Sequence, residues 1–136
     1  MQQLYKGSLL ALATVLTLKT TAQLGPLDLT FATDGIFESD LGGGTPQGRA
    51  VALQPDGKIV MAGRGNLTGM WFDWLVIRLT TDGVLDTTFS GDGIASSGWS
   101  AANDQAQRVE IQSDGKILIA GFHYDGAIGI PMVVRL

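Results

Sequence analysis

The chain has 136 residues with 19 glycines, and 45% of its residues are hydrophobic while only 16% are charged. This composition excludes a disordered tail, which carries fewer apolar side chains, and a coiled coil, which tolerates few glycines. The formal net charge is −4 and the cations form no cluster, which argues against a nucleic-acid partner because phosphate binding relies on Lys and Arg.

Residues 1–22 are typical of a cleavable signal peptide. Lys6 precedes an apolar run over residues 9–18, and small and polar residues follow up to Ala22. The apolar run is about half as long as a helix needs to cross a bilayer of about 30 Å, so no membrane anchor is predicted. The chain has no Cys, which excludes a lipid-modified cysteine and any disulfide. We expect cleavage before Gln23 and a secreted, periplasmic or cell-surface protein.

The remainder of the chain is an internal repeat. A shift of 58 positions aligns most of its blocks, and the last strand matches after a loop shortened by one residue. The matching segments are 27–31 with 85–89, 34–36 with 92–94, 51–59 with 109–117, 62–63 with 120–121, and 76–79 with 133–136. We therefore divide the chain into a signal peptide (1–22), repeat 1 (23–80) and repeat 2 (81–136).

Each repeat is predicted to form four short strands. In repeat 1 these strands cover residues 36–39, 49–54, 59–63 and 73–80. Pro-Asp-Gly joins the second and third strands, and Ser-Asp-Gly does so in repeat 2; both are typical of a tight hairpin turn. Apolar residues at consecutive positions indicate strands that are covered on both faces. Stacked four-stranded sheets around an axis, which form a β-propeller, meet that requirement.

The order of these blocks resembles the delta-60 repeat family of bacterial β-propeller sequences. The blocks are Leu-Asp-x-x-Phe with a following Asp-Gly, then Val-x-(Leu/Ile)-Gln-x-Asp-Gly-Lys-Ile-x-x-x-Ala-Gly, then an apolar strand that ends Arg-Leu. The resemblance covers residues 25–136 in two copies. It implies one blade per repeat, in exported proteins that usually carry many repeats, and no general catalytic activity. Repeat 2 departs from repeat 1 at Glu110, which aligns with Ala52, and at Pro131.

The expected fold is therefore all-β, with two four-stranded β-propeller blades. Closed propellers typically have four to eight blades, and two blades alone would leave two apolar sheet faces open. Three explanations stay open: the chain is part of a longer protein, several chains close one ring, or the pair packs in another way. The expected partners accordingly include further blades, in cis or in trans.

The repeated polar residues are predicted to serve turns. Asp28 and Asp86 recur in the Leu-Asp-x-x-Phe block, and a residue that chemistry needs once has no reason to recur. No alternating series of Asp or Asn suits calcium, and the segment 43–50 lacks the Lys and Ser/Thr of a phosphate-binding loop. His123 is the only histidine and is expected on the surface or in a loop. No catalytic residue, metal or cofactor is predicted.

The aromatic cluster before the last strand of repeat 1 is the candidate contact site for a ligand or partner. Trp71 and Trp74 have no aromatic counterpart in repeat 2, where the sequence reads Ile-Gly-Ile-Pro. Such residues either pack between blades or bind a glycan or a protein. The sequence thus favours an exported, non-enzymatic module that acts as scaffold or recognition surface. The alternative is a carbohydrate-binding or glycan-active protein, whose acids would be Asp73 and Glu110 in a shared cleft.

Overall fold

The computed structural model describes residues 25–41, 44–67, 71–98 and 103–136, so the predicted signal peptide lies outside the described residues. All regular structure within these ranges is β-strand. No helix among them has the length and apolar character that crossing a membrane requires. The seven strands are β1 (Gln47–Leu53), β2 (Ile59–Gly65), β3 (Asp73–Leu79), β4 (Ile94–Ser97), β5 (Gln105–Ile111), β6 (Ile117–Asp125) and β7 (Ile128–Arg135).

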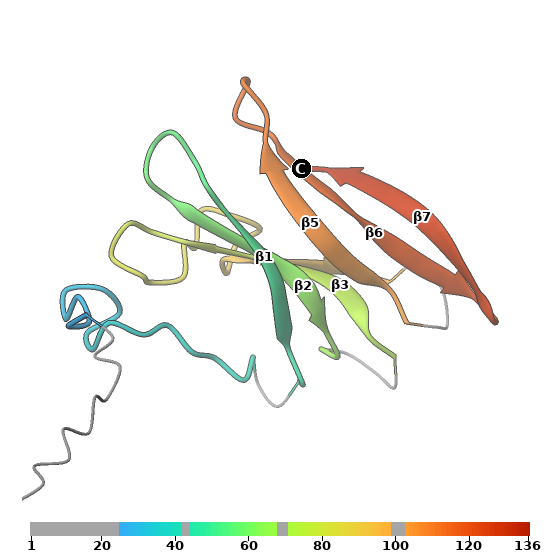
Figure 1. Cartoon of the computed structure of the whole chain (residues 1–136), viewed down its shortest axis with the longest axis horizontal. Coiled ribbons are helices and arrows are strands. Elements are labelled where there is room, and N and C mark those ends of the chain that lie inside the picture. The colour runs from blue at the N-terminus through green and yellow to red at the C-terminus, as the bar shows by residue number, and fades with distance from the viewer. Residues whose placement is uncertain (1–24, 42–43, 68–70, 99–102) are drawn as a thin grey trace, which may run out of the picture.

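The strands form two antiparallel sheets that stack on each other. The first sheet has the order β1-β2-β3-β4 and the second has the order β5-β6-β7 (Figure 1). The all-β prediction is thereby confirmed, and the two antiparallel sheets are consistent with a partial β-propeller. The second sheet holds three strands in the part of the chain that the structure describes, not the predicted four.

Both hairpins have the predicted turn. The amide of Gly57 donates to the carbonyl of Gln54 at 2.9 Å, and Gly57 has a φ of 84°. Gly115 makes the same contact with Gln112 at 2.9 Å and has a φ of 83°. Glycine is favoured at this position because other residues meet steric cost at positive φ. The Asp-Gly pairs at 56–57 and 114–115 therefore mark the tips of the β1–β2 and β5–β6 hairpins, as predicted.

The prediction of a first strand in repeat 1 was wrong, because residues 36–39 form no strand. Their counterpart in repeat 2 is β4, which pairs with β3 through Val76 opposite Ala95 and Ile77 opposite Ile94. A strand needs a neighbour that satisfies its backbone groups. β4 is paired with β3, whereas residues 36–39 have no neighbouring strand among the described residues. The sheet therefore begins at β1 and ends at β4, offset from the repeat seen in the sequence.

The main core lies between the two sheets. It is built from buried residues of both: Val60, Ala62, Trp74 and Val76 of the first sheet, and Ala106, Ile117, Ile119 and Met132 of the second. The other face of β3 packs in a second cluster, where Leu75, Ile77 and Leu79 contact Phe31, Phe37 and Leu41. The consecutive apolar residues of β3 are thus covered on both faces, as their pattern predicted.

Candidate interaction surfaces

The two tryptophans of the candidate contact site lie in different surroundings. Trp74 is 5% exposed and belongs to the core between the sheets. Trp71 is 45% exposed and precedes β3. A flat binding platform requires both rings at the surface, so the structure leaves Trp71 as the member of this pair that a ligand can reach.

The residues beside Trp71 hold the chain before β3 in place. The amide of Phe72 donates to Oδ1 of Asn103 at 3.1 Å, and its carbonyl accepts from the amide of Asp104 at 2.6 Å. The guanidinium of Arg64 lies 4.3 Å from the centre of the Phe72 ring, within the range of a cation–π contact. Trp71 therefore projects from a chain segment that is tied to the start of the second sheet.

An acidic pair lies at the same end of the sheets. Asp104 is fully buried and stands just before β5. Desolvation, and then the charge of Asp104, raise the pKa of Asp73 above its ordinary value. Asp104 was not singled out from the sequence. The one feature that marks it there is a difference between the repeats, since repeat 1 has Pro46 at the aligned position. Burial beside a second acid became visible only in the fold.

Asp73 and Glu110, the acids of the glycan-active alternative, are not brought together. Asp73 interacts with Asp104, which stands just before β5. Glu110 is exposed and lies on β5, six positions after Asp104. At about 3.3 Å per residue this separates Glu110 from Asp104 by roughly 20 Å. Two carboxylates that share a glycosidic bond stand within about 10 Å of each other. The geometry therefore gives these two residues no common cleft.

The repeated Asp residues stabilise turns, as predicted. Asp86 accepts hydrogen bonds at Oδ1 from the amide of Thr88 at 3.1 Å and from its hydroxyl at 2.6 Å. Its other oxygen, Oδ2, receives Nε of Arg78 at 2.8 Å and Nζ of Lys58 at 3.2 Å. The Thr88 hydroxyl first, and the two cations besides, hold the pKa of Asp86 far below its usual range. The carboxylate is an ionised structural anchor.

Asp28 makes the same turn without the cations. Its Oδ1 accepts from the amide of Thr30 at 3.0 Å and from the hydroxyl at 2.6 Å. These bonds lower the pKa of Asp28 below its ordinary value. Asp28 is exposed, and no salt bridge joins it to a cation among the residues that the structure describes.

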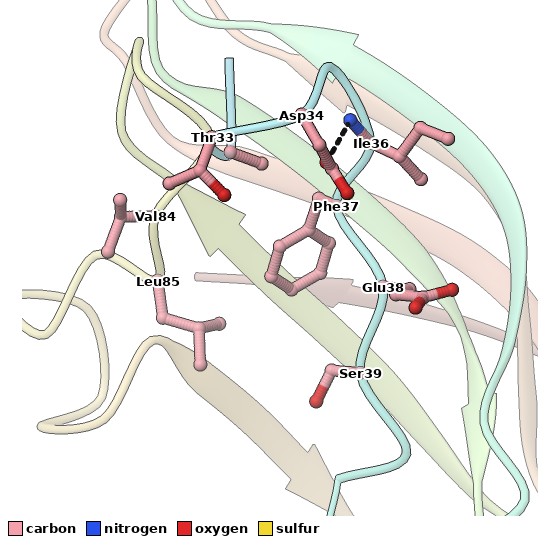
Figure 2. Close-up of a pocket in the computed structure, with 10 residues that line it drawn as sticks. Thr33, Asp34, Ile36, Phe37, Glu38, Ser39, Val84 and Leu85 are labelled. Carbon is pink, nitrogen blue, oxygen red and sulfur yellow. Dashed lines mark hydrogen bonds between the residues drawn. The ribbon is translucent and has the colours of Figure 1, made fainter. Parts of the chain in front are cut away.

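A hollow of about 480 Å³ lies between residues 32–39 and residues 83–85 (Figure 2). The Phe37 ring faces it, with Val84 and Leu85 on the opposite wall. The carboxylate of Asp34 is occupied by the amide of Ile36, 3.0 Å away. The hollow is open to solvent and its wall is mainly apolar.

His123 lies within β6, opposite Ile130 of β7, and is partly buried rather than in a loop. Within the described ranges, no group of three or more His, Asp or Glu side chains is arranged to hold a metal ion.

Comparison with known proteins supports the repeat class that the stacked sheets define. Residues 54–89 match the model of a family described as "Domain of unknown function (DUF5122) beta-propeller". The match runs from the β1–β2 turn through β3 to the second Leu-Asp-x-x-Phe block, and it confirms the predicted resemblance to β-propeller repeats. No curated protein and no solved structure matches the chain. The chain thus carries a β-propeller repeat domain of unknown function.

Proposed function

We propose that the protein is an exported, non-enzymatic β-propeller repeat module that presents a recognition surface on a rigid scaffold. The observation that carries this proposal is that the residues found in both repeats are used by the fold, whereas an exposed residue found in one repeat is not. The repeated residues, such as Asp86 and Gly57, are used by turns and ion pairs within the fold. The exposed Trp71 is unrepeated and is not required by the core.

A carbohydrate is the ligand class that we assign to the surface around Trp71. An exposed indole stacks on the apolar face of a sugar ring and can donate one hydrogen bond from its N–H. Arg64 and Asn103 both contact Phe72, the residue that follows Trp71, and can supply polar contacts. Binding without turnover is favoured over hydrolysis because Asp73 and Glu110 share no cleft.

Replacement of Trp71 tests this assignment. We expect Trp71→Ala to weaken glycan binding on an array at least tenfold, since an aromatic anchor at the centre of a contact typically supplies more than about 1.4 kcal/mol. Ile128→Ala removes an apolar side chain of β7 that is 69% exposed, more than Trp71, and serves as the control. Binding that persists in Trp71→Ala, or a wild-type protein that binds no glycan, would contradict carbohydrate recognition at this surface and leave the scaffold role.

A further inference from the structure

We propose that the chain associates with itself head to tail: residues 27–39 of one copy complete the three-stranded sheet of a second copy by adding a strand beside β7. The same contact brings Asp28 of one copy onto Arg135 of the other. This inference concerns self-association and does not depend on the ligand proposed for Trp71. It follows from the contact that the two repeats already make within one chain.

The segment 27–36 already has the conformation of its counterpart, 85–94. The amide of Gly35 donates to the carbonyl of Phe31 at 2.7 Å, and the amide of Gly93 donates to that of Phe89 at 2.8 Å. Gly35 and Gly93 have φ values of 89° and 90°. The Asp side chains also make the same bond in both turns. The amide of Ile36 donates to Oδ1 of Asp34 at 3.0 Å, and the amide of Ile94 donates to Oδ1 of Asp92 at 2.9 Å. The turn that leads into β4 in repeat 2 is therefore also present before residues 36–39.

The outer edge of β7, away from β6, is the matching open edge. In the first sheet the amide of Arg78 donates to the carbonyl of Gly93 at 2.9 Å, next to β4. Arg135 is the counterpart of Arg78. Its neighbour Leu136 exchanges both backbone hydrogen bonds with Ile117 of β6, so alternation turns the backbone groups of Arg135 outward. β6 is the one neighbour of β7 in the described sheet.

The repeat also specifies the register of the added strand. β3 pairs Val76 with Ala95 and Ile77 with Ile94. The aligned residues are Val133 and Val134 on β7, and Phe37 and Ile36 on the segment. Val133 is 64% exposed whereas its counterpart Val76 is fully buried. The added strand would cover Val133 with Phe37, and Pro131, which has no amide to donate, would end the ladder.

Charge complementarity supports the same contact. Asp86 binds Arg78 at 2.8 Å, and the Arg78 guanidinium also lies 4.7 Å from the centre of the Phe89 ring. Their counterparts, Asp28 and Arg135, are both exposed in the single chain. A second copy would unite them, with Arg135 also over the ring of Phe31, the counterpart of Phe89.

The outer face of the first sheet also carries apolar side chains that a second copy would cover. Val109 and Ile111 of β5 pack against the core between the sheets. Their counterparts on β1, Val51 and Leu53, are largely exposed. The second sheet of another copy would cover them as the first sheet covers Val109 and Ile111. Exposed apolar positions whose counterparts are partly buried against a neighbouring sheet point to a further blade rather than to solvent.

A second copy fits as the occupant because the two halves of the contact lie on opposite sides of one chain. Figure 1 shows residues 25–41 beyond β1 and the outer edge of β7 at the other end of the stack. Such a contact joins different patches of identical chains and generates either a closed ring or an open chain of copies. A ring of propeller size, with two blades per copy, would hold on the order of two to four copies.

Charge reversal tests the contact, with size-exclusion chromatography and light scattering on the purified protein over a concentration series. The wild type is expected to form assemblies of two or more copies. Asp28→Arg and Arg135→Asp each set like charges against one another, so each variant alone is expected to dissociate, with an apparent Kd raised roughly 100-fold. An equimolar mixture restores the assembly, because the new cation of one variant meets the new anion of the other.

Two further variants keep the result interpretable. Asp28→Asn keeps the side-chain oxygen that binds Thr30 and removes the charge, so it is expected to weaken association less than Asp28→Arg while leaving the turn intact. Asp125→Arg makes the same charge change at the end of β6, outside the contact, and is expected to assemble like the wild type. A wild type that is monomeric at every concentration, single variants that assemble normally, or a mixture that stays dissociated would each overturn the proposal.

Discussion

Asp28 and Asp86 have the same sequence context and the same turn, yet their surroundings differ. Asp86 is 4% exposed and is held by Thr88, Arg78 and Lys58. A buried carboxylate is tolerated when cations and donors replace the water it loses. Asp28 has the threonine and no cation. The role of this repeated Asp thus depends on whether a neighbouring sheet supplies the Arg and the Lys.

Replacement of Asp86 by Asn is the prediction at this scale. Asp86→Asn leaves Arg78 and Lys58 without their anion, so the Tm at neutral pH is expected to fall by about 5 °C or more. The folded-state pKa of Asp86 is lowered, so its stabilisation is present above the unfolded pKa of about 3.9 and is lost as the pH falls toward the folded value. Circular dichroism melts should therefore show a smaller acid-induced loss of Tm below about pH 4 in the variant.

Asp92→Asn is the matched control. Asp92 accepts one amide hydrogen bond, from Ile94 at 2.9 Å, and is exposed. Its Tm is expected to follow the wild-type pH profile closely. Equal profiles for Asp86→Asn and the wild type below pH 4 would rule out Asp86 as the anchor described here.

The first two strands of each sheet share one irregularity, a register shift near the start of the pairing. It lies between Gly48 and Ala50 in the first sheet and between Ala106 and Arg108 in the second. Gly63 faces this shift, and a Cβ atom there would overlap the carbonyl oxygen of Gln47. Glycine is needed at this point because two backbones approach too closely for any side chain.

Gly63→Ala is therefore expected to destabilise the protein by about 1–3 kcal/mol, because backbone atoms must move to admit the methyl group. Gly129→Ala in β7 is the control, since its nearest neighbour, a ring carbon of Tyr124, is 3.4 Å from the added Cβ. Its effect is expected to stay within about 0.5 kcal/mol. Urea denaturation measures both, and a Gly63→Ala midpoint equal to that of the wild type would refute the close-approach argument.

At the scale of the whole molecule, two sheets share one core and expose different ends. One end presents Val51 and Leu53 of β1, and the other presents the outer edge of β7 with Val133. The core between the sheets draws on both sheets, so neither sheet buries its apolar face without the other. The two ends differ, as the proposed head-to-tail contact requires.

Export is the prediction that concerns the whole chain. In a bacterial host with a general secretion pathway, we expect the protein to leave the cytoplasm and N-terminal sequencing to begin at Gln23. Leu12→Arg interrupts the apolar run and is expected to retain the chain, uncleaved, in the cytoplasm. Cytoplasmic retention of the unchanged chain with residues 1–22 still attached would refute the assignment of a signal peptide.

Much of the fold was predictable from local pattern, whereas the candidate site was predictable only in part. Asp-Gly turns and consecutive apolar residues depend on near neighbours in the chain, so both hairpins and the covered strand β3 were foreseen. The different surroundings of Trp71 and Trp74 were not, because the facing sheet decides which of two residues three positions apart is buried. The buried Asp104 beside Asp73 likewise joins residues that are distant in sequence.

The sequence by itself determined that this is an all-β repeat protein with paired hairpins. Turn chemistry and apolar periodicity are local properties, and both occur twice in the chain. Only the tertiary structure decided which sheet each strand joins. Residues 94–97 became β4 beside β3, while the aligned residues 36–39 stayed outside any sheet. The physical reason is that a strand is completed by hydrogen bonds to a neighbour, and a repeated sequence does not say whether that neighbour is there.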